Sequence, residues 1–202
     1  MDNSTIPNGI PKEVWGALII VIEKLIYPIT ATTVGVGKLI EFKFKQLNEI
    51  QKIIAEKTLQ DAVEKVKNSP QKDFDNVTVK PEVICVTLDN TDAQVDDNMR
   101  NLWSNLTARE LSEGSIHPEI ARLLAKLTKE DLVVLSDIAE KDASLPKLFI
   151  TALASAYTFG VLRNKKSFHH VYLRKLGLIE DVSGKWFLTT FGRELIRSIK
   201  EL

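Results

Sequence analysis

The sequence contains one cysteine among 202 residues and has no excess of either charge, since 27 Lys and Arg balance 27 Asp and Glu. A single cysteine, Cys85, excludes a disulfide within the chain and fits a reducing compartment. The zero net charge excludes a global field that would draw the chain to nucleic acid or to anionic lipid. We therefore expect a cytoplasmic protein with a packed core, for which an apolar content of 44% is sufficient.

The sequence also lacks an apolar run of about 20 residues, the length that spans a bilayer. Residues 14–22 are nearly all apolar, but Glu23 and Lys24 follow them, and Pro28 ends or kinks a helix. Residues 1–13 lack the basic start of a signal peptide and predict a flexible lead. We expect an apolar helix from residue 14 that packs within the protein. Membrane contact by residues 14–40 is the alternative, because they hold few charges.

No phosphate-binding loop is present. Gly37 and Lys38 resemble the end of one, but Thr32 and Leu39 stand where that loop needs glycine and Ser or Thr. We expect Gly37 to serve in a turn or in helix packing. We expect no cofactor and infer no small-molecule substrate from the sequence.

Local patterns of metal binding and nucleophilic catalysis are missing too. His117 precedes a proline at a predicted helix start, and His169 and His170 are adjacent, so they point about 100° apart on a helix. No cysteine or histidine stands at zinc-ligand spacing from them, and no GxSxG elbow occurs. Triads scattered in sequence would leave no such trace. We expect no metal site and no enzymatic activity.

A long amphipathic helix is predicted from about Val36 to Val66. Its apolar residues recur on one stripe and charges of both signs occupy much of the rest, which calls for a partner helix or a second subunit. Residues 14–66 are thus expected to form a helical arm. The stripe consists of Val36, Ile40, Leu47, Ile50, Ile54, Ala62 and Val66.

A linker is predicted at residues 67–80, where proline, asparagine and aspartate interrupt the helical period. A helical domain over residues 81–202 follows. Pro81 suits a first helical position, and residues 82–88 favour helix over strand. Asp92 is expected to cap the next helix, which Gly114 ends. The apolar stripe of that helix is Val95, Met99, Leu102, Trp103 and Leu106.

Three further helices are expected before the tail. Pro118 opens one, with Ile120, Leu123, Leu124 and Leu127 facing inward. Thr128 begins a second through a variant of the capping box, with Leu132, Leu135, Ile138 and Ala139 facing inward. A third is expected from Pro146 to Tyr157.

The last 36 residues predict a short helix, a hairpin and a final helix. Ser167 can cap a helix that ends at Leu176, with Gly177 behind it. Residues 178–180 and 186–188 are expected to be strands around a turn at 183–184. Thr189 or Thr190 would cap the last helix, from residue 191 to about 202. This order is typical of a winged-helix-like module, here from about residue 128 to 202.

A basic cluster near the end is the main candidate for a surface function. Residues 163–202 hold nine Lys and Arg against four Asp and Glu, so their net charge is 9 − 4 = +5. Two interpretations stay open: the charges keep the module soluble, or they contact nucleic acid or another anionic partner. Phe168 and Tyr172 are expected to face the core. The cluster comprises Arg163, Lys165, Lys166, His170, Arg174 and Lys175.

Two segments carry a family pattern. Residues 101–132 read NLWSNLTARELSEGSIHPEIARLLAKLTKEDL, and the tail contains LRKLGLIE and FLTTFGREL. Together they resemble the Abi-alpha family, bacterial proteins named for an association with abortive phage infection. The pattern residues look structural, so no catalytic role is carried over. They are Leu102, Trp103, Leu106, His117, Pro118, Leu127, Thr128, Asp131, Gly177, Thr189 and Gly192.

The resemblance implies a mainly helical bacterial protein in phage defence. Our leading hypothesis is a non-enzymatic protein that acts by binding a protein partner or by self-assembly as a homo-oligomer. A DNA-binding regulator that uses the tail module is the second hypothesis. The third is a membrane-acting effector that uses residues 14–40.

Overall fold

In a computed structural model of the chain, the described residues are 39–40, 42–69, 77, 79–141 and 167–202. They are mainly helical and include one two-stranded antiparallel hairpin. The chain divides into two compact units, Met1–Ala121 with Glu201–Leu202, and Arg122–Lys200. We call them unit 1 and unit 2. The predicted apolar helix from residue 14, most of the linker at 67–80 and the predicted helix over residues 146–157 lie outside the described residues.

The first described helix of unit 1 covers residues 39–46, apart from position 41, and α3 (Glu49–Asn68) follows it. The prediction of one continuous helix from 36 to 66 is therefore wrong. Asn48 ends the continuity because its extended backbone and its side chain cap α3: Asn48 Oδ1 accepts the Gln51 N–H at 2.9 Å, and Gln51 Oε1 accepts the Asn48 N–H at 3.0 Å. This reciprocal capping box satisfies two backbone donors that a continuous helix would not expose.

Because of the break, the buried face of α3 differs from the predicted apolar stripe. Ala55, Leu59, Ala62 and Val66 are buried in α3, whereas Ile50, predicted to face inward, is 70% exposed.

Two shorter helices lead from α3 to the central helix of unit 1. These are α4 (Pro81–Asp89), with Pro81 in its first turn as predicted, and the 3-10 helix η2 (Thr91–Val95). The cap of α5 (Asp97–Glu113) is Asp96 and not Asp92, since Asp96 Oδ1 accepts the N–H groups of Asn98 and Met99. Val95 consequently lies outside the helix and is 66% exposed, so its predicted inward position is wrong.

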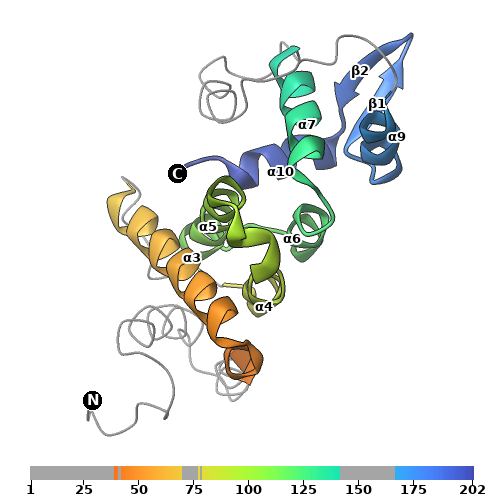
Figure 1. The fold of residues 1–202 in the computed structure, drawn as a ribbon. Helices are drawn as coiled ribbons and strands as arrows, with labels where there is room; N and C mark the ends of the chain where they lie inside the picture. Colours follow the sequence, from red (N-terminus) through yellow and green to blue (C-terminus); the bar gives the residue numbers. More distant parts are fainter. Residues whose placement is uncertain (1–38, 41, 70–76, 78, 142–166) are drawn as a thin grey trace, which may run out of the picture. The chain divides into compact units, whose positions relative to one another are not determined.

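The core of unit 1 forms where α3 packs along α5, with η2 and α4 beside them (Figure 1). Nearly every residue of α5 after Met99 is buried, including fully buried Trp103 and Leu106. Gly114 ends α5 in the left-handed conformation, as predicted. The second helix that the long amphipathic segment required is therefore α5 of the same chain.

The predicted helix at Pro118 is α6 (Pro118–Leu124). His117 caps it, because its carbonyl accepts the Ile120 N–H at 2.8 Å and its Nδ1 accepts the Glu119 N–H at 3.2 Å. The predicted inward residues Ile120, Leu123, Leu124 and Leu127 are buried.

Unit 2 contains α7 (Lys129–Lys141), α9 (Phe168–Lys175), β1 (Ile179–Val182), β2 (Lys185–Leu188) and α10 (Thr190–Ile199). Strands β1 and β2 pair antiparallel, with Ile179 opposite Leu188. Their turn places Ser183 and Gly184 at positive φ, which suits a two-residue hairpin loop. The predicted order of helix, hairpin and helix is confirmed.

One junction locks α9, the hairpin and α10 together. After α9, the N–H groups of Gly177 and Leu178 bond to the carbonyls of Arg174 and Leu173, a Schellman ending with Gly177 at φ 73°. Thr189 Oγ1 donates to the Gly177 carbonyl at 2.5 Å and accepts the Gly192 N–H at 3.1 Å. Thr189, rather than Thr190, is thus the cap of α10.

Gly192 allows the closest approach at that junction. A Cβ on this residue would lie 2.1 Å from the Leu178 carbonyl oxygen, which no side chain can tolerate. The glycine is therefore required by backbone contact between α10 and the start of the hairpin.

Candidate functional site

The described part of the predicted basic cluster lies on α9. Arg163, Lys165 and Lys166 fall outside the described residues. Arg174 and Lys175 are exposed in the last turn of α9. Within the part of the chain that the structure describes, neither forms an ion pair. Two cations are therefore open to an anionic partner.

His170 does not add a third cation. Burial lowers the pKa of its imidazole below the usual 6.5, an effect that Asp137 opposes, so the ring is largely neutral at pH 7. The ring is tilted against Trp186 of β2, with centroids 5.1 Å apart, and its Nδ1 lies 2.9 Å from Ser167 Oγ. His170 thus connects α9 to the hairpin.

Phe168 lies at the surface, contrary to the prediction that it faces the core. Its side chain is 75% exposed, and Val171 on the same face is 58% exposed. The Phe168 ring runs within 7° of parallel to Tyr172, with centroids 6.0 Å apart. Tyr172 itself is half-buried, and its hydroxyl donates to the Lys126 carbonyl at 3.0 Å. Only Leu173 of α9 is fully buried, so the helix has a narrow inner face.

His169 is held by a buried carboxylate that the sequence did not link to it. His169 Nδ1 lies 2.8 Å from Asp131 Oδ1, and the Asp131 side chain is 2% exposed. The other oxygen, Oδ2, accepts the Thr128 N–H at 2.9 Å and completes the predicted capping box of α7. Asp131 therefore both completes the capping box that Thr128 begins and orients a ring on α9. A separation of 38 residues leaves no local signal for this pair.

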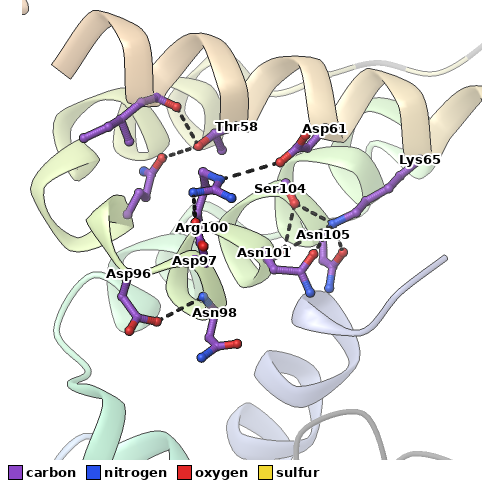
Figure 2. A network of polar contacts seen from close by, with 12 residues as sticks. Thr58, Asp61, Lys65, Asp96, Asp97, Asn98, Arg100, Asn101, Ser104 and Asn105 are labelled. Carbon is purple, nitrogen blue, oxygen red and sulfur yellow. Dashed lines mark hydrogen bonds and ion pairs between the residues drawn. The ribbon is translucent and has the colours of Figure 1, made fainter. Parts of the chain in front are cut away.

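A second polar cluster missed by sequence reasoning lies between α3 and α5 (Figure 2). Lys65 Nζ donates to Asn101 Oδ1, Ser104 Oγ and Asn105 Oδ1 at 2.5, 2.5 and 2.6 Å. Burial lowers the pKa of the Lys65 ammonium, while Asp61 opposes the shift. Asn101, Ser104 and Asn105 share one face of α5 at helical spacing. That spacing was the available signal, but only the packing of α3 brings the lysine to it.

A buried carboxyl group lies toward the other end of α5. Glu110 is fully buried, and its two oxygens accept the N–H groups of Lys80 at 2.5 Å and Ile116 at 2.9 Å. Burial raises the pKa of Glu110 to about 7, although both backbone donors and the Lys80 ammonium favour the charged form. Through these hydrogen bonds, Glu110 links the start of α4 and the loop after α5 to α5 itself.

Large apolar side chains remain exposed at the start of unit 1. Leu39 and Phe42 are 44% and 57% exposed on the helix over 39–46. Ile50 and Ile53 are 70% and 65% exposed on the first turns of α3. We call these four residues the N-terminal apolar set. Each pair is spaced i, i+3 and lies on one side of its helix.

The described residues hold neither a cluster of metal ligands nor a membrane-spanning helix. Among them, no group of three or more His, Cys, Asp and Glu side chains is placed to hold a metal ion. Within the same residues, no helix combines the length and the apolar character needed to cross a bilayer. Most of the predicted membrane-contact segment, residues 14–38, lies outside them.

The comparisons with known proteins bear on the family pattern. Neither the curated proteins nor the solved structures contain a significant match to the chain. The family model described as abortive infection alpha matches residues 48–187. That range runs from the cap of α3 to β2 and includes the helix with Trp103 and the capping box at Thr128. Because the model covers more than half of the chain, this protein belongs to the abortive infection alpha family.

Proposed function

We propose that the chain is a non-enzymatic phage-defence protein that acts by binding a protein partner or further copies of itself. Membership of the abortive infection alpha family supports the defence context. The observation that carries the binding is the N-terminal apolar set of unit 1, whose four side chains are 44–70% exposed. Several large apolar side chains exposed on consecutive helices are typical of surfaces that become covered on association.

The packing of α3 supports association through this set. The inner stripe of α3 is already covered by α5, and Ile50 and Ile53 bury little of their side chains within unit 1. Each isoleucine that stays in water lacks the stabilisation of about 1.5 to 3 kcal/mol that full burial of its side chain would give. A contact with another protein surface would recover that free energy.

The polar clusters support a structural rather than catalytic interpretation. Lys65 and Ser104 are close enough for a base and a nucleophile, but Ser104 is fully buried. Asp131 and His169 resemble an oriented acid–base pair, but the second oxygen of Asp131 is engaged in the capping box of α7. Both clusters contribute bonds between helices, which is sufficient reason for their presence.

We also propose that α7, α9, the hairpin and α10 form a winged-helix-like module. The order of its elements supports this, and α9 would be its recognition helix. Regulation by reading duplex DNA is less favoured, because the exposed residues in the first turns of α9 are Phe168 and Val171. Neither donates a hydrogen bond to a base edge.

Sedimentation velocity over a range of protein concentrations tests the association. We expect the wild-type chain to associate, and the change Ile50→Ser with Ile53→Ser to weaken association at least tenfold. Serine and isoleucine have similar helix propensities, so the fold should persist. Val95→Ser is the matched control, since Val95 is 66% exposed in the same unit but outside the apolar set.

If neither self-association nor a loss in the Ile50/Ile53 variant is seen, self-assembly through this set is wrong. A plaque assay with and without the gene then tests the defence role itself. We expect fewer plaques for at least some phages, and the Ile50/Ile53 variant should lose the protection while Val95→Ser keeps it. Unchanged titres across a broad phage panel would contradict the defence function.

A further inference from the structure

The exposed face of α9 combines apolar and cationic side chains on a single short helix. At 100° per residue, Phe168, Val171 and Lys175 project from one side, opposite the buried Leu173, and Arg174 flanks them. The helix contains no acidic residue. This surface, which we call the α9 face, lies in unit 2 and shares no residue with the N-terminal apolar set.

The Phe168 ring is held in place although it is exposed. Tyr172 runs parallel to it, and His169 meets it edge-on at 79° with centroids 6.0 Å apart. Both neighbours are anchored: Tyr172 bonds to the Lys126 carbonyl, and His169 bonds to the buried Asp131. The ring therefore presents a prearranged flat surface, and a ligand that stacks on it pays little ordering entropy.

The charges next to the ring favour an anionic ligand. Arg174 and Lys175 follow Phe168 by six and seven residues, which is about 10 Å along the helix axis. Among the described residues, neither is neutralised by an ion pair. A polyanion with flat groups would match the ring and both cations at once.

Unpaired nucleotides provide this combination, whereas duplex DNA does not. In a duplex the base faces are stacked on one another, and a groove exposes only base edges. Single strands offer the base faces to aromatic side chains and the phosphates to Lys and Arg. We propose that the α9 face binds single-stranded nucleic acid, with a base stacked on Phe168 and backbone phosphates on Arg174 and Lys175. This goes beyond the proposed association, which uses other residues.

Fluorescence anisotropy with the full chain tests the proposal. The probes are a labelled 12-nucleotide oligo(dT), a labelled 12-nucleotide oligo(U) and a 12-base-pair duplex, each over a series of salt concentrations. We expect at least one single strand to bind about tenfold or more tightly than the duplex. Unlabelled polyglutamate, a polyanion without bases, should compete poorly.

The variants separate stacking from charge. Phe168→Leu keeps an apolar side chain and should weaken single-strand binding about tenfold, since one base stack is lost. Arg174→Gln with Lys175→Gln should reduce the slope of log affinity against log salt by about 1.4, at about 0.7 per phosphate contact. Phe191→Leu is the matched control, because Phe191 is 55% exposed on α10 of the same unit. It should bind as the wild type does.

Several outcomes would overturn the proposal. Equal binding of duplex and single strand would indicate a groove contact, and equal competition by polyglutamate would indicate an acidic protein surface as the partner. No binding of either strand at low salt would exclude nucleic acid altogether. Phe168→Leu changes one surface side chain and should melt within about 2 °C of the wild type. A loss of binding then cannot be attributed to unfolding.

Discussion

At the scale of single residues, two glycines of the family pattern are required for different physical reasons. Gly177 needs a positive φ of 73° at the end of α9, and the space where a Cβ would stand is open. Gly192 needs room, because a Cβ would meet the Leu178 carbonyl oxygen. A strained backbone costs about 1 to 2 kcal/mol for a residue with a side chain, whereas a backbone clash forces elements apart.

We therefore predict that Gly192→Ala destabilises the chain more than Gly177→Ala does. The expected losses in the free energy of unfolding are about 3 kcal/mol or more and about 1 to 2 kcal/mol respectively. Urea denaturation followed by circular dichroism measures both. Equal losses would mean that the contact between α10 and Leu178 can relax.

Glu110 gives a prediction about pH. Its pKa is raised to about 7 in the folded chain from 4.5, so the folded state binds the proton more tightly than the unfolded state does. Its contribution to stability is therefore fully present below pH 4.5 and is lost as the pH rises through 7, by about 3 kcal/mol at most. Glu110→Gln removes this titration.

The measurement is urea denaturation of both proteins between pH 4.5 and 8. The stability of Glu110→Gln relative to the wild type should rise across that range. Below pH 5 the variant should be the less stable of the two, because its amide cannot accept both backbone N–H groups. A difference that does not vary with pH would show that folding does not shift the pKa of Glu110.

At the scale of elements, helix starts decide where the chain turns. Asn48 divides a segment whose apolar period runs on through it, and Asp96 sets the start of α5. In both cases the side chain accepts hydrogen bonds from backbone N–H groups in the first turn of the helix that follows. Those N–H groups have no partner within that helix. Periodicity alone could not find these breaks, since polar residues at 48 and 96 fit a solvent-facing position equally well.

The cap of α10 gives a prediction at this scale, because two adjacent threonines could supply it. Thr189 bonds to both Gly177 and Gly192, whereas Thr190 is exposed in the first turn. We expect Thr189→Ala to lower the free energy of unfolding by about 1 to 2 kcal/mol and Thr190→Ala by less than about 0.5 kcal/mol. Thermal denaturation of the two variants side by side measures this difference. The reverse order would assign the cap to Thr190.

At the scale of the whole molecule, the two proposed binding surfaces lie on different compact units. The N-terminal apolar set is in unit 1, and the α9 face is in unit 2. We expect Ile50→Ser with Ile53→Ser to lose association and keep oligonucleotide binding, and Phe168→Leu to show the opposite. Sedimentation and anisotropy on the same two proteins check this. Loss of both properties in either variant would mean that the surfaces are not independent.

Patterns within the sequence were sufficient to predict the family, the helical class and the order of elements in the tail. Its strongest signals were short-range ones: apolar residues at helical spacing around Trp103, the capping box at Thr128, and glycines where the backbone turns. These features depend on neighbours within four or five residues, so they can be predicted from the chain alone. The order of helix, hairpin and helix at the end followed from the same local rules.

The contacts between side chains that are distant in the sequence depend on how the helices pack. Lys65 with the polar face of α5, Asp131 with His169, and Glu110 with Lys80 join residues 30 to 40 positions apart. The packing also leaves Phe168 facing solvent, because Leu173 is the one fully buried residue of α9. The rings of His169 and His170 contact Asp131 and Trp186 on either side of it. Long-range packing selects among faces that local periodicity leaves equivalent, and the proposed nucleic-acid surface depends on that selection.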